Sequence, residues 1–265
     1  MSRIRRVFAQ SKPPALIAYV TVGYPSLEAT LEVVPLLERL GVDIVELGIP
    51  FSDPLVDGVT IQSASSRALQ EGVTATSCLE VARQLRRNLE IPLVLMSYYN
   101  PIFSYGLQDF TQAAAEAGVD GLIIPDLPPG EDEELRMAKR GLQLDLIQLV
   151  GPTSTPARVE QVAASSEGFV YLVSVAGVTG ARAVLPYGLK DLIQRVKACS
   201  DQPVCVGFGI STAEQAQEVG QLADGVVVGS RIVELMGESA RWEDPVSTFV
   251  STLREGLDKL GGLTP

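Results

Sequence analysis

Short apolar runs alternate with amphipathic segments along the whole chain. The runs hold four to six residues, are rich in Val, Ile and Leu, and are typical of strands buried on both faces of a parallel sheet. The predicted strands are Leu16–Val20, Asp43–Leu47, Leu93–Met96, Gly121–Ile124, Leu144–Leu149, Phe169–Val173, Val204–Gly207 and Gly225–Val228. Helical periodicity fills the intervals and predicts helices at 26–41, 61–70, 77–89, 107–118, 131–140, 156–165, 189–199, 212–220 and 245–260.

Local signals mark several of these boundaries. Ser26 is a plausible N-cap for the helix that follows it, and Gly41 is a plausible stop. Pro35 lies inside this helix, so we expect a kink or an irregular turn there. Three segments repeat the order of a helix end, an Asp and a strand: 41–45, 118–122 and 223–227. This is a recurrent helix-to-strand joint, with intervals too long and unequal for a solenoid.

Eight strand-and-helix units in one chain favour a closed (β/α)8 TIM barrel of the α/β class, with an open doubly wound sheet as the alternative. No linker or shift in composition divides the sequence, so we expect residues 1–265 to form a single barrel domain. The active site of such a barrel lies where the strands end and the loops to the helices begin.

Composition narrows the classes of function. The 265 residues carry a net charge of −11, which argues against a nucleic-acid or anionic-membrane surface. No apolar stretch approaches the roughly 20 residues that span a bilayer. The three cysteines lack Cys-x-x-Cys spacing, and the basic start lacks the apolar run of a secretory signal. We expect a cytoplasmic protein, or a plastid or organelle stromal one if the source is a eukaryotic alga.

The chain contains no histidine. Catalytic triads that use histidine, histidine-ligated zinc and an imidazole general base are therefore excluded. Chemistry must come from carboxylates, lysine, tyrosine, backbone donors or a cofactor.

The segment around the second predicted strand carries the strongest candidate for such chemistry. Glu46 lies within an apolar run, and Asp53 and Asp57 follow in a Pro- and Gly-rich loop. Burying an unpaired carboxylate is costly, and functional sites are where that cost is usually tolerated. The alternative is that Glu46 pairs with an arginine or with backbone donors inside the barrel.

Glycines cluster at the ends of the last three strands, in 176–180, 207–211 and 229–230. Glycine lets backbone N–H groups approach an anion closely, and a phosphate site after the last two strands is frequent in barrels. Ser211 and Ser230 can each cap the helix that follows, and the Ser230 hydroxyl can donate to a phosphate. The alternative is that these glycines only form tight turns. Gly207 and Gly209 lack the third glycine of a dinucleotide fingerprint, so NAD or FAD is not expected.

These stretches resemble the tryptophan synthase alpha chain family over essentially the full chain. The matching segments are 46–58, 97–101, 126–128, 171–174, 177–180, 207–211 and 228–230. The resemblance implies a (β/α)8 barrel that cleaves indole-3-glycerol phosphate to indole and glyceraldehyde 3-phosphate. It also implies a tryptophan synthase beta chain as partner in an α2β2 assembly. Pyridoxal phosphate is expected only in that beta chain, with no cofactor or metal in this one.

The resemblance also assigns residues by position. Glu46 and Asp57 match the catalytic carboxylates, and Gly180, Gly209, Gly229 and Ser230 match the phosphate contacts. The indole pocket matches Tyr19, Ile61, Tyr98, Ile123, Tyr171 and Phe208. Some members have Phe at position 19, so the Tyr19 hydroxyl needs a partner or solvent. The loops with Pro50, Asp53 and Asn100 are expected to meet the beta chain.

Two carboxylates suffice for this cleavage, because indole protonated at C3 accepts the electrons of the breaking bond. We expect burial to raise the pKa of Glu46, so that it exchanges protons near neutral pH. We expect Asp57, on a more solvated loop, to stay ionised beside the indole nitrogen. The alternatives are a stand-alone lyase that releases indole, another phosphate-binding barrel such as an isomerase or epimerase, and a subunit that mainly activates a partner.

Overall fold

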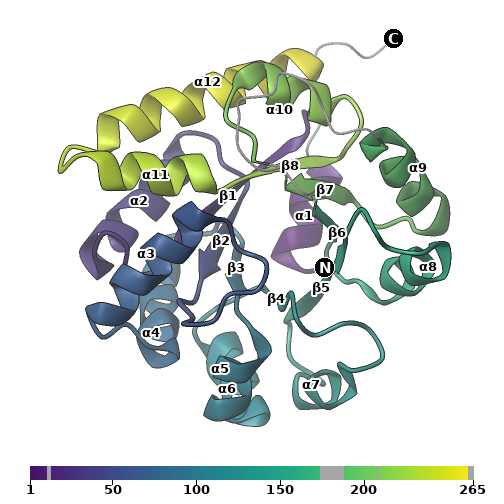
Figure 1. Ribbon diagram of the computed structural model, residues 1–265, viewed down its shortest axis with the longest axis horizontal. Coiled ribbons are helices and arrows are strands. Elements are labelled where there is room, and N and C mark those ends of the chain that lie inside the picture. Colours follow the sequence, from purple (N-terminus) through teal and green to yellow (C-terminus); the bar gives the residue numbers. More distant parts are fainter. Residues whose placement is uncertain (11–12, 174–187, 208, 262–265) are drawn as a thin grey trace.

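Eight parallel strands form a closed barrel in chain order in the computed structural model, which describes residues 1–10, 13–173, 188–207 and 209–261 (Figure 1). The strands are β1 (Ala15–Thr21), β2 (Ile44–Gly48), β3 (Leu93–Met96), β4 (Gly121–Ile123), β5 (Asp145–Val150), β6 (Val170–Val173), β7 (Val204–Gly207) and β8 (Gly225–Val228). The predicted (β/α)8 barrel is confirmed, and each predicted strand agrees at both ends to within one residue. That residues 1–265 form one domain stays a prediction.

Helices surround the barrel, and every predicted helix is present. These are α2 (Leu27–Arg39), α3 (Val59–Gln70), α4 (Ala75–Arg86), α6 (Leu107–Glu116), α7 (Glu133–Ala138), α8 (Pro156–Ser165), α9 (Leu189–Cys199), α10 (Ala213–Gly220) and α12 (Glu243–Gly261). Three further helices were not predicted: α1 (Arg3–Gln10), α5 (Tyr99–Tyr105) and α11 (Ser230–Glu238). Within the described ranges, no helix is long and apolar enough to cross a bilayer.

The N-terminal part of α2 behaves as its sequence predicts. The Ser26 side chain accepts a hydrogen bond from the Ala29 N–H and caps the helix. Pro35 lies inside the helix, which runs on to Arg39 as one element, so the predicted irregular turn is wrong. Proline removes one backbone donor, but Val33, Val34 and Leu37 are fully buried around it. Burial of this face stabilises the helix by more than one hydrogen bond contributes.

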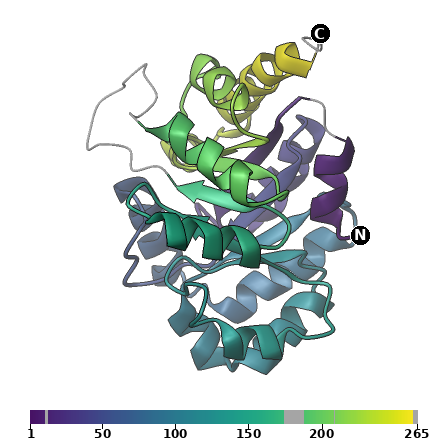
Figure 2. The same ribbon diagram turned by 90° about the vertical axis from the view of Figure 1, so that its right-hand side faces the viewer.

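Helix α1 closes one end of the barrel. Its Ile4 is fully buried against the inward-facing side chains of the strands, and Val7 and Phe8 pack on the same cluster. That cluster comprises Ile17, Ile44, Val94, Ile123, Ile147, Phe169, Cys205 and Val227. In Figure 2, α1 (purple) lies at the right-hand edge of the barrel. Helix α1 therefore fills the barrel interior at the amino-terminal ends of the strands, and the active site of such a barrel is expected at the opposite end.

Acidic side chains link the strands in pairs at this closed end. Each of these carboxylates lies shortly before an even-numbered strand and accepts a hydrogen bond from a backbone N–H of the preceding odd-numbered strand. Each also forms an ion pair with a basic side chain. The four bonds are Leu16 N–H to Asp43 (2.8 Å), Leu93 N–H to Asp120 (2.9 Å), Leu146 N–H to Glu167 (2.7 Å) and Val204 N–H to Asp224 (2.8 Å). The predicted joints at 41–45, 118–122 and 223–227 are three of these four positions.

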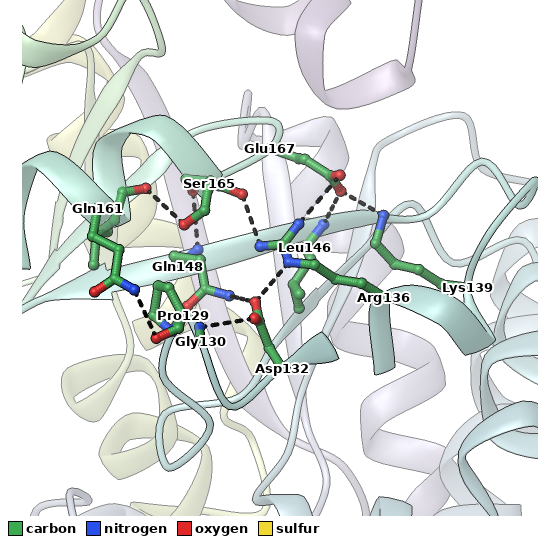
Figure 3. A network of polar contacts seen from close by, with 12 residues as sticks. Pro129, Gly130, Asp132, Arg136, Lys139, Leu146, Gln148, Gln161, Ser165 and Glu167 are labelled. Atoms are coloured by element: carbon green, nitrogen blue, oxygen red, sulfur yellow. Dashed lines mark hydrogen bonds and ion pairs between the residues drawn. The ribbon is translucent and has the colours of Figure 1, made fainter. Parts of the chain in front are cut away.

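The Glu167 joint belongs to a larger polar network between α7, β5 and α8. Figure 3 shows Lys139 and Arg136 reaching Glu167, with N···O distances of 2.6 and 3.7 Å. Arg136 also donates to Asp132, which accepts a second hydrogen bond of 2.9 Å from Gln148 on β5. Because Asp132 and Gln148 are both buried, their mutual satisfaction fixes α7 against the barrel wall.

We expect Asp120→Ala to lower the free energy of unfolding by about 3–5 kcal/mol, because it leaves the guanidinium of Arg86 buried without its partner. Asp120 is 6% exposed and lies 2.7 Å from Arg86 and 3.1 Å from Arg3. The control is Asp224→Ala, where Asp224 and its partner Lys197 are 42% and 39% exposed; its ion pair should contribute about 1 kcal/mol or less. Urea unfolding monitored by circular dichroism measures both. Equal losses would contradict this ranking.

Candidate active site

Glu46 lies in the middle of β2 and points into the barrel. It is fully buried, and its two neighbours along the ladder are Tyr19 on β1 and Val94 on β3. Neither carboxylate oxygen has a hydrogen-bond partner among the described residues, so the alternative of an internal arginine or backbone pairing is wrong. Burial raises the pKa of Glu46 from 4.5 to about 8. The predicted pKa shift is confirmed in direction, and Glu46 carries a proton near neutral pH.

Inward-facing side chains become more exposed towards the carboxyl ends of the strands. Four of them, on β1, β3, β5 and β6, keep part of their surface exposed: Tyr19, Met96, Leu149 and Tyr171. The residues two positions earlier on the same strands, Ile17, Val94, Ile147 and Phe169, are all buried. The barrel interior is therefore less covered at the carboxyl ends of the strands, and Glu46 is buried next to these partly exposed side chains.

Two of the exposed rings lie across glycines of the next strand. A side chain at Gly48 would overlap the Tyr19 hydroxyl, and one at Gly207 would overlap the Tyr171 hydroxyl. Gly207 was predicted to approach an anion, but the structure explains it by the tyrosine that covers it. The Tyr19 hydroxyl has the partner that the sequence required, since it lies 3.4 Å from Thr21 Oγ1.

Asp57 is held at the rim by contacts to its own loop. The Val56 N–H donates to the Tyr98 hydroxyl (3.1 Å), and the Gln62 side-chain amide donates to the Asp57 carbonyl (2.8 Å). Asp57 is half-buried, and it is therefore more solvated than the fully buried Glu46, as the sequence predicts. Burial raises the pKa of the Asp57 carboxyl above its ordinary value, while a hydrogen bond with the Tyr98 side chain acts in the opposite direction.

Sequence reasoning missed two residues of this rim. The Phe51 and Tyr98 rings lie 5.3 Å apart between centroids, and Gln62 lies in the first turn of α3. Gln62 gives no signal in the sequence, because its role depends on the path of the loop. Phe51 lies within the 46–58 segment, but the sequence pattern indicates no separate role for its ring.

The predicted phosphate site, called the phosphate cradle below, is described best at the N-terminus of α11. The helix has no side-chain cap: Gly229 is its N-cap, and Ser230 is its exposed first residue. The prediction that Ser230 caps this helix is therefore wrong. The first N–H groups of an uncapped helix are available to an anion.

The loop after β7 differs. Thr212, not Ser211, caps α10, through a capping box with Gln215. The Gln215 side chain also accepts from the Ser211 N–H at 2.8 Å, so the prediction that Ser211 is the cap is wrong. Gly209 has φ +55°, a conformation that favours glycine. Gly180 and Phe208 lie outside the described residues.

The pocket residues that the structure describes lie in three places. Tyr19, Tyr98 and Tyr171 surround the carboxylates, and the negative charge of Asp57 raises the pKa of all three hydroxyls in addition to the larger effect of burial. Ile123 is a fully buried barrel residue on β4. Ile61 lies outside the barrel and packs with Ala64 and Val233 between α3 and α11, beside Tyr19.

The expected partner surface is only partly exposed. Asp53 and Asn100 are exposed, whereas Pro50 is buried within the chain. Ile49 and Ile102, which lie close to Pro50 and Asn100 in the sequence, are buried as well. The large exposed apolar side chains in this region are Leu55 (81%) and Val56 (56%) in the loop after β2, Val59 (82%) on α3 and Phe103 (59%) on α5.

Comparison with known proteins places this site in a family. The family model for the tryptophan synthase alpha chain matches residues 6–259. The tryptophan synthase alpha chain of Dehalococcoides mccartyi is 56% identical over 258 residues, which is 97% of this chain and 100% of that one. The alpha chain of Chloroflexus aurantiacus is 48% identical over 97% of this chain and 98% of its own. A chain from the structure of Mycobacterium tuberculosis tryptophan synthase superposes with a TM-score of 0.90 at 39% identity and covers 97% of this chain and 98% of its own.

Proposed function

This chain belongs to the tryptophan synthase alpha chain family, and we propose that Glu46 and Asp57 perform its lyase reaction, the cleavage of indole-3-glycerol phosphate to indole and glyceraldehyde 3-phosphate. One observation supports the assignment most strongly. A fully buried carboxyl group, with no hydrogen-bond partner among the residues that the structure describes, lies inside the barrel next to the carboxyl ends of the strands. Such an arrangement destabilises the fold and is expected only where the group has a chemical task.

One group can make both proton transfers of the reaction, because indole C3 and the side-chain hydroxyl lie next to each other. Protonated Glu46 donates its proton to indole C3, which makes the ring an iminium-like electron acceptor. The resulting carboxylate then takes the proton of the adjacent side-chain hydroxyl. The carbon–carbon bond breaks, its electrons restore the indole, and the glycerol chain leaves as an aldehyde. Glu46 ends protonated, so the cycle is balanced. A pKa near the working pH suits both directions of transfer.

Asp57 acts on the other side of the ring. A carboxylate beside the indole N–H stabilises the positive charge that develops on the nitrogen. The contacts from Tyr98 and Gln62 fix its loop before substrate binds, so little reorganisation is needed. The uncapped N-terminus of α11 with Gly229 and Ser230 is the proposed site for the phosphate. Binding energy at this unreactive end positions the bond that breaks.

We assign this chain a beta-chain partner because its relatives are alpha chains of tryptophan synthase. The finer proposal is an α2β2 assembly in which indole passes to a beta chain that carries pyridoxal phosphate, with no cofactor needed in the alpha chain. The exposed apolar side chains at Leu55, Val59 and Phe103 support a docking surface on the loops after β2 and β3. A stand-alone lyase would use the same carboxylates, and a mainly activating subunit would not need them.

The test of the proposed function is product formation by the purified chain. Incubation with indole-3-glycerol phosphate should release indole and glyceraldehyde 3-phosphate in equal amounts, and an equimolar beta chain should raise the rate. Turnover without any response to a beta chain would favour the stand-alone lyase. Absence of both products, with and without the beta chain, would contradict the proposal.

We expect Ser230→Asp to raise the KM for the substrate by about tenfold or more, because it places a negative charge at the proposed phosphate position. Inorganic phosphate should compete with substrate in the parent and much less in the variant. Ser239→Asp, beyond the other end of α11, serves as the control and should change neither value. An unchanged inhibition constant for phosphate in Ser230→Asp would show that phosphate does not bind at the N-terminus of α11.

We expect Asn100→Asp to lower activation by a beta chain by about threefold or more while the isolated activity changes little. Asn100 is exposed near the start of α5, where a negative charge favours the helix, so unfolding of α5 is not a competing explanation. A new charge at a desolvated interface is costly. Sedimentation with a beta chain measures association directly. Unchanged association and activation would place Asn100 outside the interface.

A further inference from the structure

Tyr19 connects the two ends of the candidate site. Its Cβ and ring lie beside Gly229, where an added Cβ would come within 3.0 Å of the Tyr19 Cβ and 3.2 Å of Cδ1. Its hydroxyl lies over Gly48, the next inward position after Glu46 on β2. The ring therefore spans the distance from the proposed phosphate cradle at the end of β8 to the carboxylate on β2. A bound substrate that reaches both ends must pass along this ring.

Neighbouring residues hold the ring in place. Tyr19 packs on the cluster of Ile61, Ala64 and Val233, which joins α3 to α11. Helix α3 follows the Asp57 loop, and α11 begins at Ser230. The two glycines leave room that the ring occupies, and any larger residue at position 48 would displace it.

The Tyr19 hydroxyl retains capacity for a further hydrogen bond. Its contact to Thr21 Oγ1, at 3.4 Å, is long for two hydroxyl groups. A phenol both donates and accepts, so one long contact leaves much of this capacity unused. Tyr19 is the one residue of β1 that keeps part of its surface exposed. Glu46 is the register partner of Tyr19 on the neighbouring strand, and the hydroxyl lies over Gly48, two residues further along β2.

We propose that Tyr19 determines specificity by binding, through its hydroxyl, a hydroxyl group on the three-carbon chain between the indole and the phosphate. This inference rests on the proposed function. Indole-3-glycerol phosphate carries two hydroxyls on that chain. The ring lies between the phosphate cradle and the carboxylates. Its hydroxyl therefore contacts the three-carbon chain of the substrate near the bond that breaks. An aliphatic chain of the same length would make the ring contact but not the hydrogen bond.

The experiment pairs Tyr19→Phe with a ligand that lacks the same partner. Indole-3-glycerol phosphate is the substrate, and 3-(indol-3-yl)propyl phosphate is the probe without hydroxyls. In Tyr19→Phe the ring is retained, and kcat/KM for the substrate should fall about tenfold. The dissociation constant of the probe should stay within about twofold of the parent value. Tyr24→Phe, which removes a hydroxyl at Gly237 on α11, is the control and should change neither value.

The outcomes separate the possibilities. Equal weakening of substrate and probe would assign Tyr19 a purely structural role and overturn the inference, as would no change in either. Thr21→Val leaves the Tyr19 hydroxyl in place and should keep the parent's preference for the substrate over the probe; loss of that preference would also contradict the inference. A parent chain with no turnover would remove the proposed function and this inference together. An active parent matched by Tyr19→Phe would remove the inference alone.

Discussion

Glu46→Gln is expected to lower kcat for cleavage by about 100- to 10,000-fold, because the amide keeps the size of the side chain and cannot transfer a proton. The substitution leaves the shape of the site and the phosphate cradle unchanged. The probe 3-(indol-3-yl)propyl phosphate should therefore bind with a dissociation constant close to that of the parent. A stopped assay of indole release measures the turnover. Glu71→Gln, on the surface after α3, is the control and should have parental activity. Near-normal turnover in Glu46→Gln would show that Glu46 does not transfer the proton.

The same substitution should change stability in a way that depends on pH. The pKa of Glu46 is about 8 in the folded chain and 4.5 as its ordinary value. Between these pH values the unfolded chain has lost the proton and the folded chain holds it. The free energy of unfolding of the parent therefore falls, relative to Glu46→Gln, by about 1.4 kcal/mol per pH unit across that window. Below pH 4.5 and above pH 8 the difference should stop changing. A constant difference from pH 5 to 8 would contradict the buried, protonated state.

Asp57→Asn is expected to lower kcat by about 100- to 1,000-fold, because it removes the charge that stabilises the developing cation on the indole nitrogen. The amide can still occupy the same place beside Tyr98, so the loop and its contact from Gln62 to the Asp57 carbonyl are retained. KM should change much less than kcat. Single-turnover measurements separate cleavage from product release.

Asp109→Asn is the matched control, since Asp109 is an exposed acid at the start of α6. It should leave both kinetic constants unchanged. A tenfold or smaller loss in Asp57→Asn would show that its charge is not needed, and a loss confined to KM would limit Asp57 to binding.

The strands were predictable because they are buried on both faces. Runs such as Leu93–Met96 and Val204–Gly207 contain few polar residues, and their bounds agree with the prediction. The three missed helices had weaker signals. In α1, Ile4, Val7 and Phe8 have helical spacing but lie among four basic or polar residues. Helix α5 has only 7 residues, and α11 begins directly after Gly229, which the sequence pattern assigned to a loop.

The candidate site was predictable where one residue type contradicts its surroundings. Glu46 is an acid in an apolar strand, so its burial and raised pKa follow from sequence. The sequence could not predict how far Asp57 is buried, because its burial depends on how Tyr98 and Gln62 hold the loop. The caps of α10 and α11 were also misassigned, since Ser211, Thr212 and Ser230 are all good capping residues and only the geometry distinguishes them. Likewise, only the geometry shows that Pro50 is buried.

The protonation state of Glu46 tests the account most directly. Infrared difference spectra between the parent and Glu46→Gln isolate the carboxyl group, and a pH titration of its C=O band gives the pKa. We predict a protonated carboxylic acid at pH 7 that loses its proton with a pKa of about 8. A carboxylate band already present at pH 6 would mean that Glu46 is ionised in the folded chain, and it would contradict a mechanism in which this group delivers the proton to indole C3.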